Sequence, residues 1–158
     1  MISSAIQSFV NDWRMGHIAT VGPAGPNVSP KGTFQALDTQ QLAFAEIRSP
    51  NTMANLAHDA RVEVNMVDVF SRKGARFRGE AAFHAKGSAE AEVLAPRWTE
   101  LFGEALMARS SGFVVIAVSE VKPLITPAYD VGAQERELRQ DYLARFTAMQ
   151  DAWLAAHD

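Results

Sequence analysis

The stretch LAFAEIRSPNTMANLAHDARVEVNMVDV, residues 42–69, contains the pattern that decides the fold. Its first part, Leu42–Ile47, is a short apolar run of the kind that forms a buried strand. Ser49 and Pro50 then predict a helix that runs to about His58, since Ser is favoured at the N-cap and Pro at the first helical position. From Arg61 to Val69, apolar and polar residues alternate, which indicates a strand with one buried face. The strands and helices of this stretch favour an α+β fold over a regularly alternating parallel sheet.

The same reasoning extends to both sides of this stretch. Further strands are expected at His17–Val21, Thr33–Leu37, Ala75–Ala85 and Phe113–Val118. Turn residues at 22–26 and 38–40 make the early strands an antiparallel meander. A helix capped by Ser3 or Ser4 and stopped by Gly16 comes first, and a helix capped by Ser88 contains Pro96, which should kink or restart it. We predict one α+β domain, residues 1–158, around a small antiparallel barrel of six or seven strands with flanking helices, with the barrel core at about 16–119.

The last part of the chain, residues 133–156, is predicted to be an amphipathic helix. Leu138, Tyr142, Phe146, Met149 and Trp153 recur at helical spacing and form one apolar stripe. Such a stripe must be buried, and the sequence leaves two surfaces open for it: a partner subunit or the chain's own barrel.

Composition excludes several classes of protein. The 158 residues include four His and no Cys, and the formal net charge is −3. Disulfides, thiolate metal sites and iron–sulfur clusters are therefore excluded. The His residues are scattered with no HExxH, so no metal site is predicted, and the motifs of hydrolases, P-loop enzymes and Rossmann proteins are missing. No secretory signal or apolar run of ~20 residues is present, so we expect a cytoplasmic protein that does not enter a membrane.

Basic loops within this acidic chain point to a small anionic ligand. Residues 47–79 carry six Lys or Arg against three Asp or Glu. The segment Arg48-Ser49-Pro50-Asn51-Thr52 places a guanidinium, hydroxyls and an amide at a helix N-terminus, where free N–H groups favour a phosphate. The alternative is that Ser49 only caps the helix and Arg48 only meets water. Two more basic loops, Ser29–Gly32 and Ser71–Gly74, suggest one shared ligand if the three loops converge.

Five motifs in fixed order resemble a known family. They are PxxxPKG ending at Gly32, a strand ending Phe44-Ala45-Glu46, RSPNTxxNL from Arg48, DARVEVN from Asp59, and SRKGxRFRG from Ser71. Together they resemble the flavin-binding split β-barrels related to pyridoxamine 5'-phosphate oxidase. The resemblance covers residues 16–119 and implies an FMN-binding split barrel, a homodimer with the cofactor at the subunit interface, and a small-molecule substrate or electron donor.

The resemblance also implies which residues bind FMN. It places Lys31, Arg48, Ser49, Asn51 and Thr52 near the phosphate. It places the backbone of Pro30, Gly32, Ala45 and Glu46 against the ring system. A second basic element of the family matches Arg72, Lys73 and Gly74. The resemblance implies that this element reaches the phosphate or the substrate, either in its own subunit or in the partner subunit of the dimer. No catalytic residue is assigned.

The chain also departs from the family pattern. A true pyridoxamine 5'-phosphate oxidase closes with a strand that carries Arg and His for its substrate, whereas this chain ends in a helix, so that activity is not expected. We predict an FMN-dependent oxidoreductase of unknown substrate. The alternatives are a non-catalytic flavin or electron carrier, a deazaflavin-binding relative, or a haem-binding relative that uses His17 or His84. Binding of single-stranded nucleic acid is disfavoured by the acidic net charge.

Overall fold

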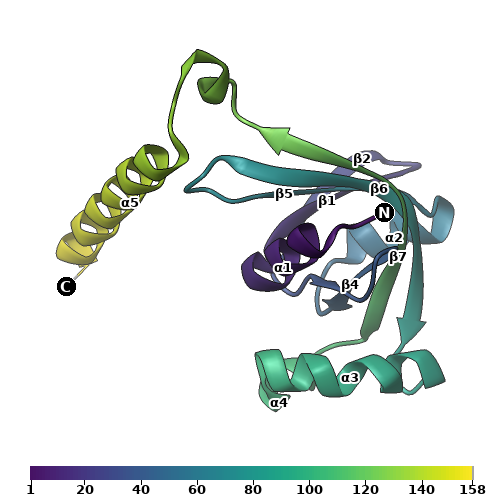
Figure 1. Cartoon of the computed structure of the whole chain (residues 1–158). Helices are drawn as coiled ribbons and strands as arrows, with labels where there is room; N and C mark the ends of the chain where they lie inside the picture. The colour runs from purple at the N-terminus through teal and green to yellow at the C-terminus, as the bar shows by residue number, and fades with distance from the viewer. Residues whose placement is uncertain (158) are drawn as a thin grey trace. The chain divides into compact units, whose positions relative to one another are not determined.

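The computed structural model describes residues 1–157, so that Asp158, the last residue of the predicted domain, lies outside the described residues. The described chain forms five α-helices, one 3₁₀ helix and seven strands (Figure 1). The helices are α1 (Ser4–Trp13), α2 (Pro50–His58), α3 (Ala89–Phe102), α4 (Glu104–Met107), η1 (Pro127–Val131) and α5 (Glu135–His157). The strands are β1 (Gly16–Gly22), β2 (Gly25–Lys31), β3 (Gln35–Ala36), β4 (Gln41–Glu46), β5 (Arg61–Val67), β6 (Lys73–Ala85) and β7 (Gly112–Ile125).

The seven strands form one sheet in the order β2-β1-β5-β6-β7-β4-β3. Strand β1 pairs antiparallel with β2 and β5, and β4 pairs antiparallel with β3 and β7. The predicted α+β class and antiparallel sheet are therefore confirmed. The pairing places the ends of β2 and β4, which carry several predicted site residues, at the starts of β1 and β7: Lys31 is opposite Gly16, and Glu46 is opposite Gly112.

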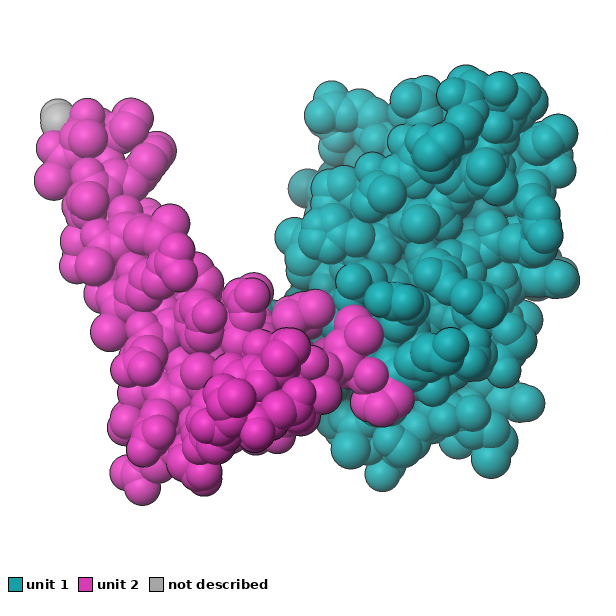
Figure 2. Space-filling model, turned by 90° about the horizontal axis from the view of Figure 1, so that it is seen from above, with its two compact units in different colours: residues 1–66, 75–122 teal, residues 67–74, 123–158 magenta. Residues whose placement is uncertain are grey.

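The chain divides into two compact units, which Figure 2 shows in different colours. Unit 1 comprises residues 1–66 and 75–122, and unit 2 comprises residues 67–74 and 123–158. Unit 1 therefore contains α1 to α4 and most of the sheet. Unit 2 contains the turn between β5 and β6, the end of β7, η1 and the described part of α5.

The core of unit 1 is built from the apolar residues that alternate along the strands and recur along α1. Ile18, Phe34, Phe44 and Phe77 are fully buried in it, and Phe34 contacts Phe44 edge to face at 5.2 Å between ring centroids. A second cluster contains Trp98 of α3 and the start of β7. Strand β4 belongs to both clusters, since Leu42 and Phe44 lie in the first and Ala43 and Ala45 in the second, so its end is held in the core.

Helix α2 lies close to the β1–β2 hairpin. A Cβ atom on Gly22 would lie 2.2 Å from the side-chain oxygen of Asn55, so only glycine fits at that place. The Asn55 amide donates to Thr20 Oγ1 at 3.2 Å, and Asn27 donates to Thr52 Oγ1 at 3.2 Å. These buried polar contacts fix the helix against the hairpin.

Some sequence predictions of element boundaries were wrong. A turn was expected at 22–26 and a basic loop at 29–32, but Gly25–Lys31 form β2. This is an edge strand, where the missing N–H groups of Pro26 and Pro30 cost no ladder bond. The strand expected at Thr33–Leu37 is only Gln35–Ala36, and the strand expected to end at Val118 continues to Ile125. Arg14 with φ of 58°, not Gly16, ends the first helix. The terminal helix and the capping of α1 by Ser3 and of α3 by Ser88 are confirmed.

Within unit 2, α5 packs with part of its predicted stripe. Tyr142 and Phe146 are half-buried, and Phe146 contacts Phe70 at 5.8 Å between ring centroids. The Arg72 guanidinium lies 5.0 Å from the centroid of the Tyr142 ring. Further along the stripe, Met149 and Trp153 are exposed, so that the apolar stripe is only partly covered.

Candidate functional site

A hollow of about 560 Å³ in unit 1 collects much of the predicted site. Five predicted residues line it: Pro30, Lys31, Gly32, Ala45 and Arg48. Two of them come from the end of β2, one follows β2 directly, one lies in β4, and one stands in the loop before α2. The structure therefore brings together two segments that the sequence could only assume to converge.

Four residues that the sequence reasoning missed complete this hollow. They are Thr33, Ile47, Leu106 and Arg109. Thr33 is a wall residue: its hydroxyl accepts from Ala45 N–H at 3.1 Å, and its carbonyl accepts from the Trp98 indole at 2.9 Å. Arg109 was missed because it lies in the loop between α4 and β7, far from the basic loops in sequence. The pairing of Gly112 with Glu46 is what brings it there.

Lys31 is a buried cation at this hollow, with 8% of its surface exposed. Its ammonium donates to Ser29 Oγ at 2.9 Å and lies 3.9 Å from a carboxylate oxygen of Glu46. It also lies 5.5 Å from the centroid of the Phe44 ring. Burial lowers the pKa of Lys31, although the negative charge of Glu46 opposes that shift.

Arg48 and Arg109 are the exposed cations of the hollow. Among residues 1–157, neither guanidinium makes an ion pair. An anion that enters the hollow can therefore bind to them without breaking an existing contact.

Glu46 holds the two donors of Ser49 that the sequence assigned to a phosphate. The Glu46 carboxylate accepts the Ser49 backbone N–H at 2.6 Å and also the Ser49 hydroxyl. Ser49 is the N-cap residue of α2, but its side chain makes no capping bond to the helix. The predicted N-cap position of Ser49 is therefore confirmed, but its hydroxyl binds the Glu46 carboxylate three residues earlier and not the helix N–H groups.

The rest of the predicted phosphate segment does not line the hollow. The side chain of Asn51 is exposed, and Thr52 is buried in contact with Asn27. The hydroxyl of Thr52 therefore serves the packing of α2 on the β1–β2 hairpin.

The second basic segment, Arg72-Lys73-Gly74, lies in unit 2 and contacts α5 and η1. The Lys73 ammonium binds Glu135 at 2.6 Å and lies 4.8 Å from the Tyr129 ring centroid. Hydrogen bonds and the charge of Glu135 raise the pKa of Lys73. Arg72 has φ of 59° and lies over Tyr142. The Lys73 ammonium is therefore already paired with a carboxylate of the same unit, Glu135.

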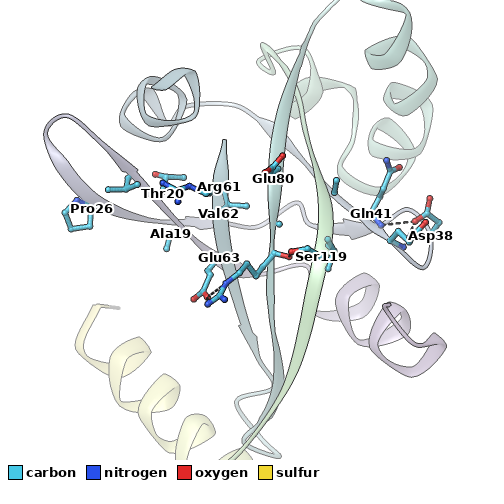
Figure 3. Close-up of a pocket in the computed structure, with 16 residues that line it drawn as sticks. Ala19, Thr20, Pro26, Asp38, Gln41, Arg61, Val62, Glu63, Glu80 and Ser119 are labelled. Atoms are coloured by element: carbon cyan, nitrogen blue, oxygen red, sulfur yellow. Dashed lines mark hydrogen bonds and ion pairs between the residues drawn. The ribbon is translucent and has the colours of Figure 1, made fainter. Parts of the chain in front are cut away.

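A larger hollow of about 1030 Å³ lies over the sheet in unit 1 (Figure 3). Its lining includes Ala19, Val62 and Ser119, with Arg61, Glu63 and Arg78 at its surface. Arg78 binds Glu63 at 2.5 Å, and Arg61 binds Asp59 at 2.6 Å. Because the cations of this hollow are already paired, the smaller hollow is the better candidate for an anion site.

The described residues include no cluster of three or more side chains that could hold a metal ion. His17 is exposed on β1, and the half-buried His84 on β6 lies 4.0 Å from Glu90. Among residues 1–157, no helix has the length and apolar character needed to cross a bilayer.

The seven-stranded antiparallel sheet, with a basic hollow at the ends of two of its strands, is of the split-barrel class of fold. The chain belongs to the pyridoxamine 5'-phosphate oxidase family, because the profile of the family described as Pyridoxamine 5'-phosphate oxidase matches residues 2–124. The predicted family and fold are thus confirmed. The match ends before η1 and α5.

Solved structures with the same fold include proteins with different described roles. HupZ of Group A Streptococcus is 24% identical with a TM-score of 0.68, over 80% of this chain and 96% of that chain. An FMN-binding protein from Syntrophomonas wolfei is 15% identical with a TM-score of 0.61, over 77% of this chain and 84% of that one. HutZ, the haem storage protein of Vibrio cholerae, is 20% identical with a TM-score of 0.56, over 77% and 93%. No curated protein sequence matches significantly.

Proposed function

We propose that the protein is an FMN-binding oxidoreductase whose cofactor occupies the hollow between the ends of β2 and β4. The observation that carries this proposal is the group of three cations, Lys31, Arg48 and Arg109, around a hollow of about 560 Å³ in a member of this family. Similarity to an FMN-binding protein of the same fold supports it.

The residues of the hollow fit the chemistry of FMN. Its volume is within the range of small-molecule sites, roughly 300–1,000 Å³. Arg48 and Arg109 offer planar donors suited to a phosphate, and Lys31 adds a buried positive charge. Ile47, Leu106 and Ala45 offer an apolar wall for a flat ring system.

In this proposal, the chain's own residues bind and orient the cofactor. The flavin supplies the redox chemistry, which is transfer of hydride or electrons. Arg48 and Arg109 hold the phosphate, Lys31 contributes positive charge, and the rigid backbone of Pro30–Thr33 and Ala45 positions the ring. The substrate remains a small molecule or an electron donor of unassigned identity.

Cofactor binding is tested by titration of the purified protein with FMN, followed by flavin fluorescence. We expect Arg48→Met and Arg109→Met each to weaken FMN binding about tenfold, the effect of losing one charge-assisted contact. Arg76→Met, at an exposed Arg of β6 outside the hollow, is the matched control and should bind FMN like the wild type. Wild-type affinity in both hollow variants, or no FMN binding at all, contradicts the proposal.

The spectrum and turnover of the protein separate the remaining alternatives. A flavin spectrum together with NADH or NADPH oxidation by small electron acceptors supports an enzyme. A flavin spectrum with electron transfer only through a partner protein supports a carrier. A haem band or a deazaflavin spectrum would show that the protein binds that cofactor in place of FMN.

We also propose that the protein forms a homodimer and that α5 contributes to it. Met149 and Trp153 of the predicted stripe are 57% and 55% exposed, which is unusual for large apolar side chains on one helix. Light scattering should show a dimer for the wild type and a larger monomer fraction for Trp153→Glu. A matched exchange at exposed Gln150, Gln150→Glu, should leave the dimer intact.

A further inference from the structure

Glu46 is a buried acid with no role in the proposed function, and its chain neighbours Ala45 and Ile47 line the candidate cofactor hollow. It is the last residue of β4, it is 3% exposed, and its carboxylate holds both donors of Ser49. Its backbone is fixed as well, because its carbonyl accepts from Ser111 N–H at 2.8 Å and from the Ser110 hydroxyl at 3.1 Å. The carboxylate therefore stands in a defined place beside the first turn of α2.

This carboxylate acts on the charge of the hollow through Lys31, which lines it. It lies 3.9 Å from the ammonium of Lys31 and offsets part of the positive charge that Lys31 presents to a ligand. A phosphate near Ser49 would meet a like charge at close range and would find the donors of Ser49 already bound. Arg48 and Arg109, which have no ion pair among residues 1–157, carry no such competition.

We infer that Glu46 determines which part of the hollow holds the phosphate of the ligand and how strongly the site prefers a phosphorylated flavin. By occupying Ser49 and partly neutralising Lys31, Glu46 directs the phosphate to Arg48 and Arg109 and keeps the preference for FMN over riboflavin low. Glu46 is thus a specificity-determining residue that acts through Ser49 and Lys31. The inference rests on the proposed function, since it assumes that a flavin binds in this hollow.

The test compares FMN with riboflavin, which lacks the phosphate, in the wild type and in Glu46→Gln. Glutamine keeps the size of the side chain and removes its charge. We expect Glu46→Gln to bind FMN about tenfold more tightly and to change riboflavin binding less than twofold. A structural role alone would move both ligands together, so the ratio of the two dissociation constants is the decisive readout. An unchanged ratio overturns the inference.

Ser49→Ala, made in the wild type and in Glu46→Gln, provides a second test. In the wild-type background the Ser49 hydroxyl is bound to Glu46, so its removal should change FMN affinity less than twofold. In the Glu46→Gln background the neutral amide oxygen holds the hydroxyl less strongly than the carboxylate does, so the hydroxyl is able to turn to the phosphate. The same substitution should then weaken FMN binding several-fold. A tenfold loss from Ser49→Ala alone would show that Ser49 already binds phosphate and would overturn the inference.

The two hypotheses fail in different ways. If neither FMN nor riboflavin binds to the wild type or to Glu46→Gln, the proposed function is wrong and this inference falls with it. If FMN binding depends on Arg48 and Arg109, but the ratio of the FMN and riboflavin dissociation constants is the same in the wild type and in Glu46→Gln, only the inference is wrong.

Discussion

Two turns of this molecule use the same local device with different results. In the Glu46–Ser49 turn of unit 1 and the Asp68–Ser71 turn of unit 2, a buried carboxylate binds the backbone N–H and the hydroxyl of a Ser three residues later. A basic residue lies beside each Ser: Arg48 precedes Ser49, and Arg72 follows Ser71. The sequence predicted a phosphate-binding segment that begins at Arg48, and a second basic segment, Arg72 to Gly74, that reaches the phosphate or the substrate.

The two turns differ in how their acids are paired with cations. Asp68 is bound by Arg139 of α5 at 2.6 Å, and the neighbouring Lys73 is bound by Glu135, so this turn is closed by the helix of its own unit. Among residues 1–157, the cation paired with Glu46 is Lys31, at 3.9 Å, and Lys31 borders a hollow. The comparison teaches that the partner of the acid, and not the basic residue beside the Ser, separates a structural turn from a candidate binding site.

The largest effect that this comparison predicts is loss of local stability in Asp68→Ala. Asp68 accepts from the N–H groups of Phe70 and Ser71 and from the Ser71 hydroxyl, and burial would leave these donors unsatisfied. We expect a loss of about 3 kcal/mol in the free energy of opening of residues 67–74, measured by native-state hydrogen exchange.

Asp38→Ala is the matched control for Asp68→Ala. Asp38 also accepts two backbone N–H groups, those of Gln40 and Gln41, but it is exposed, so water replaces the lost bonds. Its local loss should be about 1 kcal/mol or less. Equal losses at both sites would show that burial does not make the hydrogen bonds of Asp68 contribute more to stability than those of exposed Asp38.

The second effect concerns the two lysines of these regions. Lys31→Met should weaken FMN binding about tenfold, or about 1.4 kcal/mol, because Lys31 lines the hollow. Lys73→Met should change it less than twofold, because Glu135 and Tyr129 already engage Lys73. Fluorescence titration measures both, with circular dichroism to confirm folding. If Lys73→Met weakened FMN binding as much as Lys31→Met does, the second basic segment would contact the ligand, as the sequence predicted.

Most of the fold could be predicted from the sequence because it depends on local patterns. Alternation in β5, the apolar run of β4 and the Ser-Pro start of α2 each identified an element to within about two residues. The edge strand β2 could not be recognised, because Pro26 and Pro30 forbid a central strand and the chain alone does not show which strand is at the edge.

The candidate site was less predictable, because it depends on contacts between distant residues. Lys31, Arg48 and Ala45 were found through motif order, but Arg109 reaches the hollow only through the register of β7 against β4. The two acids were visible in the sequence at fixed spacing before each Ser. What the sequence could not show is that both are buried with their oxygens on the Ser donors.

The smallest of the predicted effects is a pH dependence that separates the two turns. Burial raises the pKa of Asp68, but hydrogen bonds from Ser71 and Phe70 and the charge of Arg139 outweigh it, so that the pKa lies below the ordinary value. A lowered pKa means that the folded state favours the carboxylate. Its stabilising contribution is therefore complete above the unfolded pKa of about 4 and is lost as the pH falls through the folded pKa.

Acidification from pH 6 toward pH 3 should therefore reduce the difference in stability between the wild type and Asp68→Asn. Urea unfolding at each pH measures this difference, and because the other acids are common to both proteins, their contributions cancel. An exchange at exposed Asp151 of α5, Asp151→Asn, should give a difference near zero throughout. If the difference in unfolding free energy between the wild type and Asp68→Asn stayed constant or increased on acidification, Arg139 and Ser71 would not favour the charged form of Asp68. The Asp68–Ser71 turn would then differ from the Glu46–Ser49 turn by position alone, and the comparison would lose its electrostatic basis.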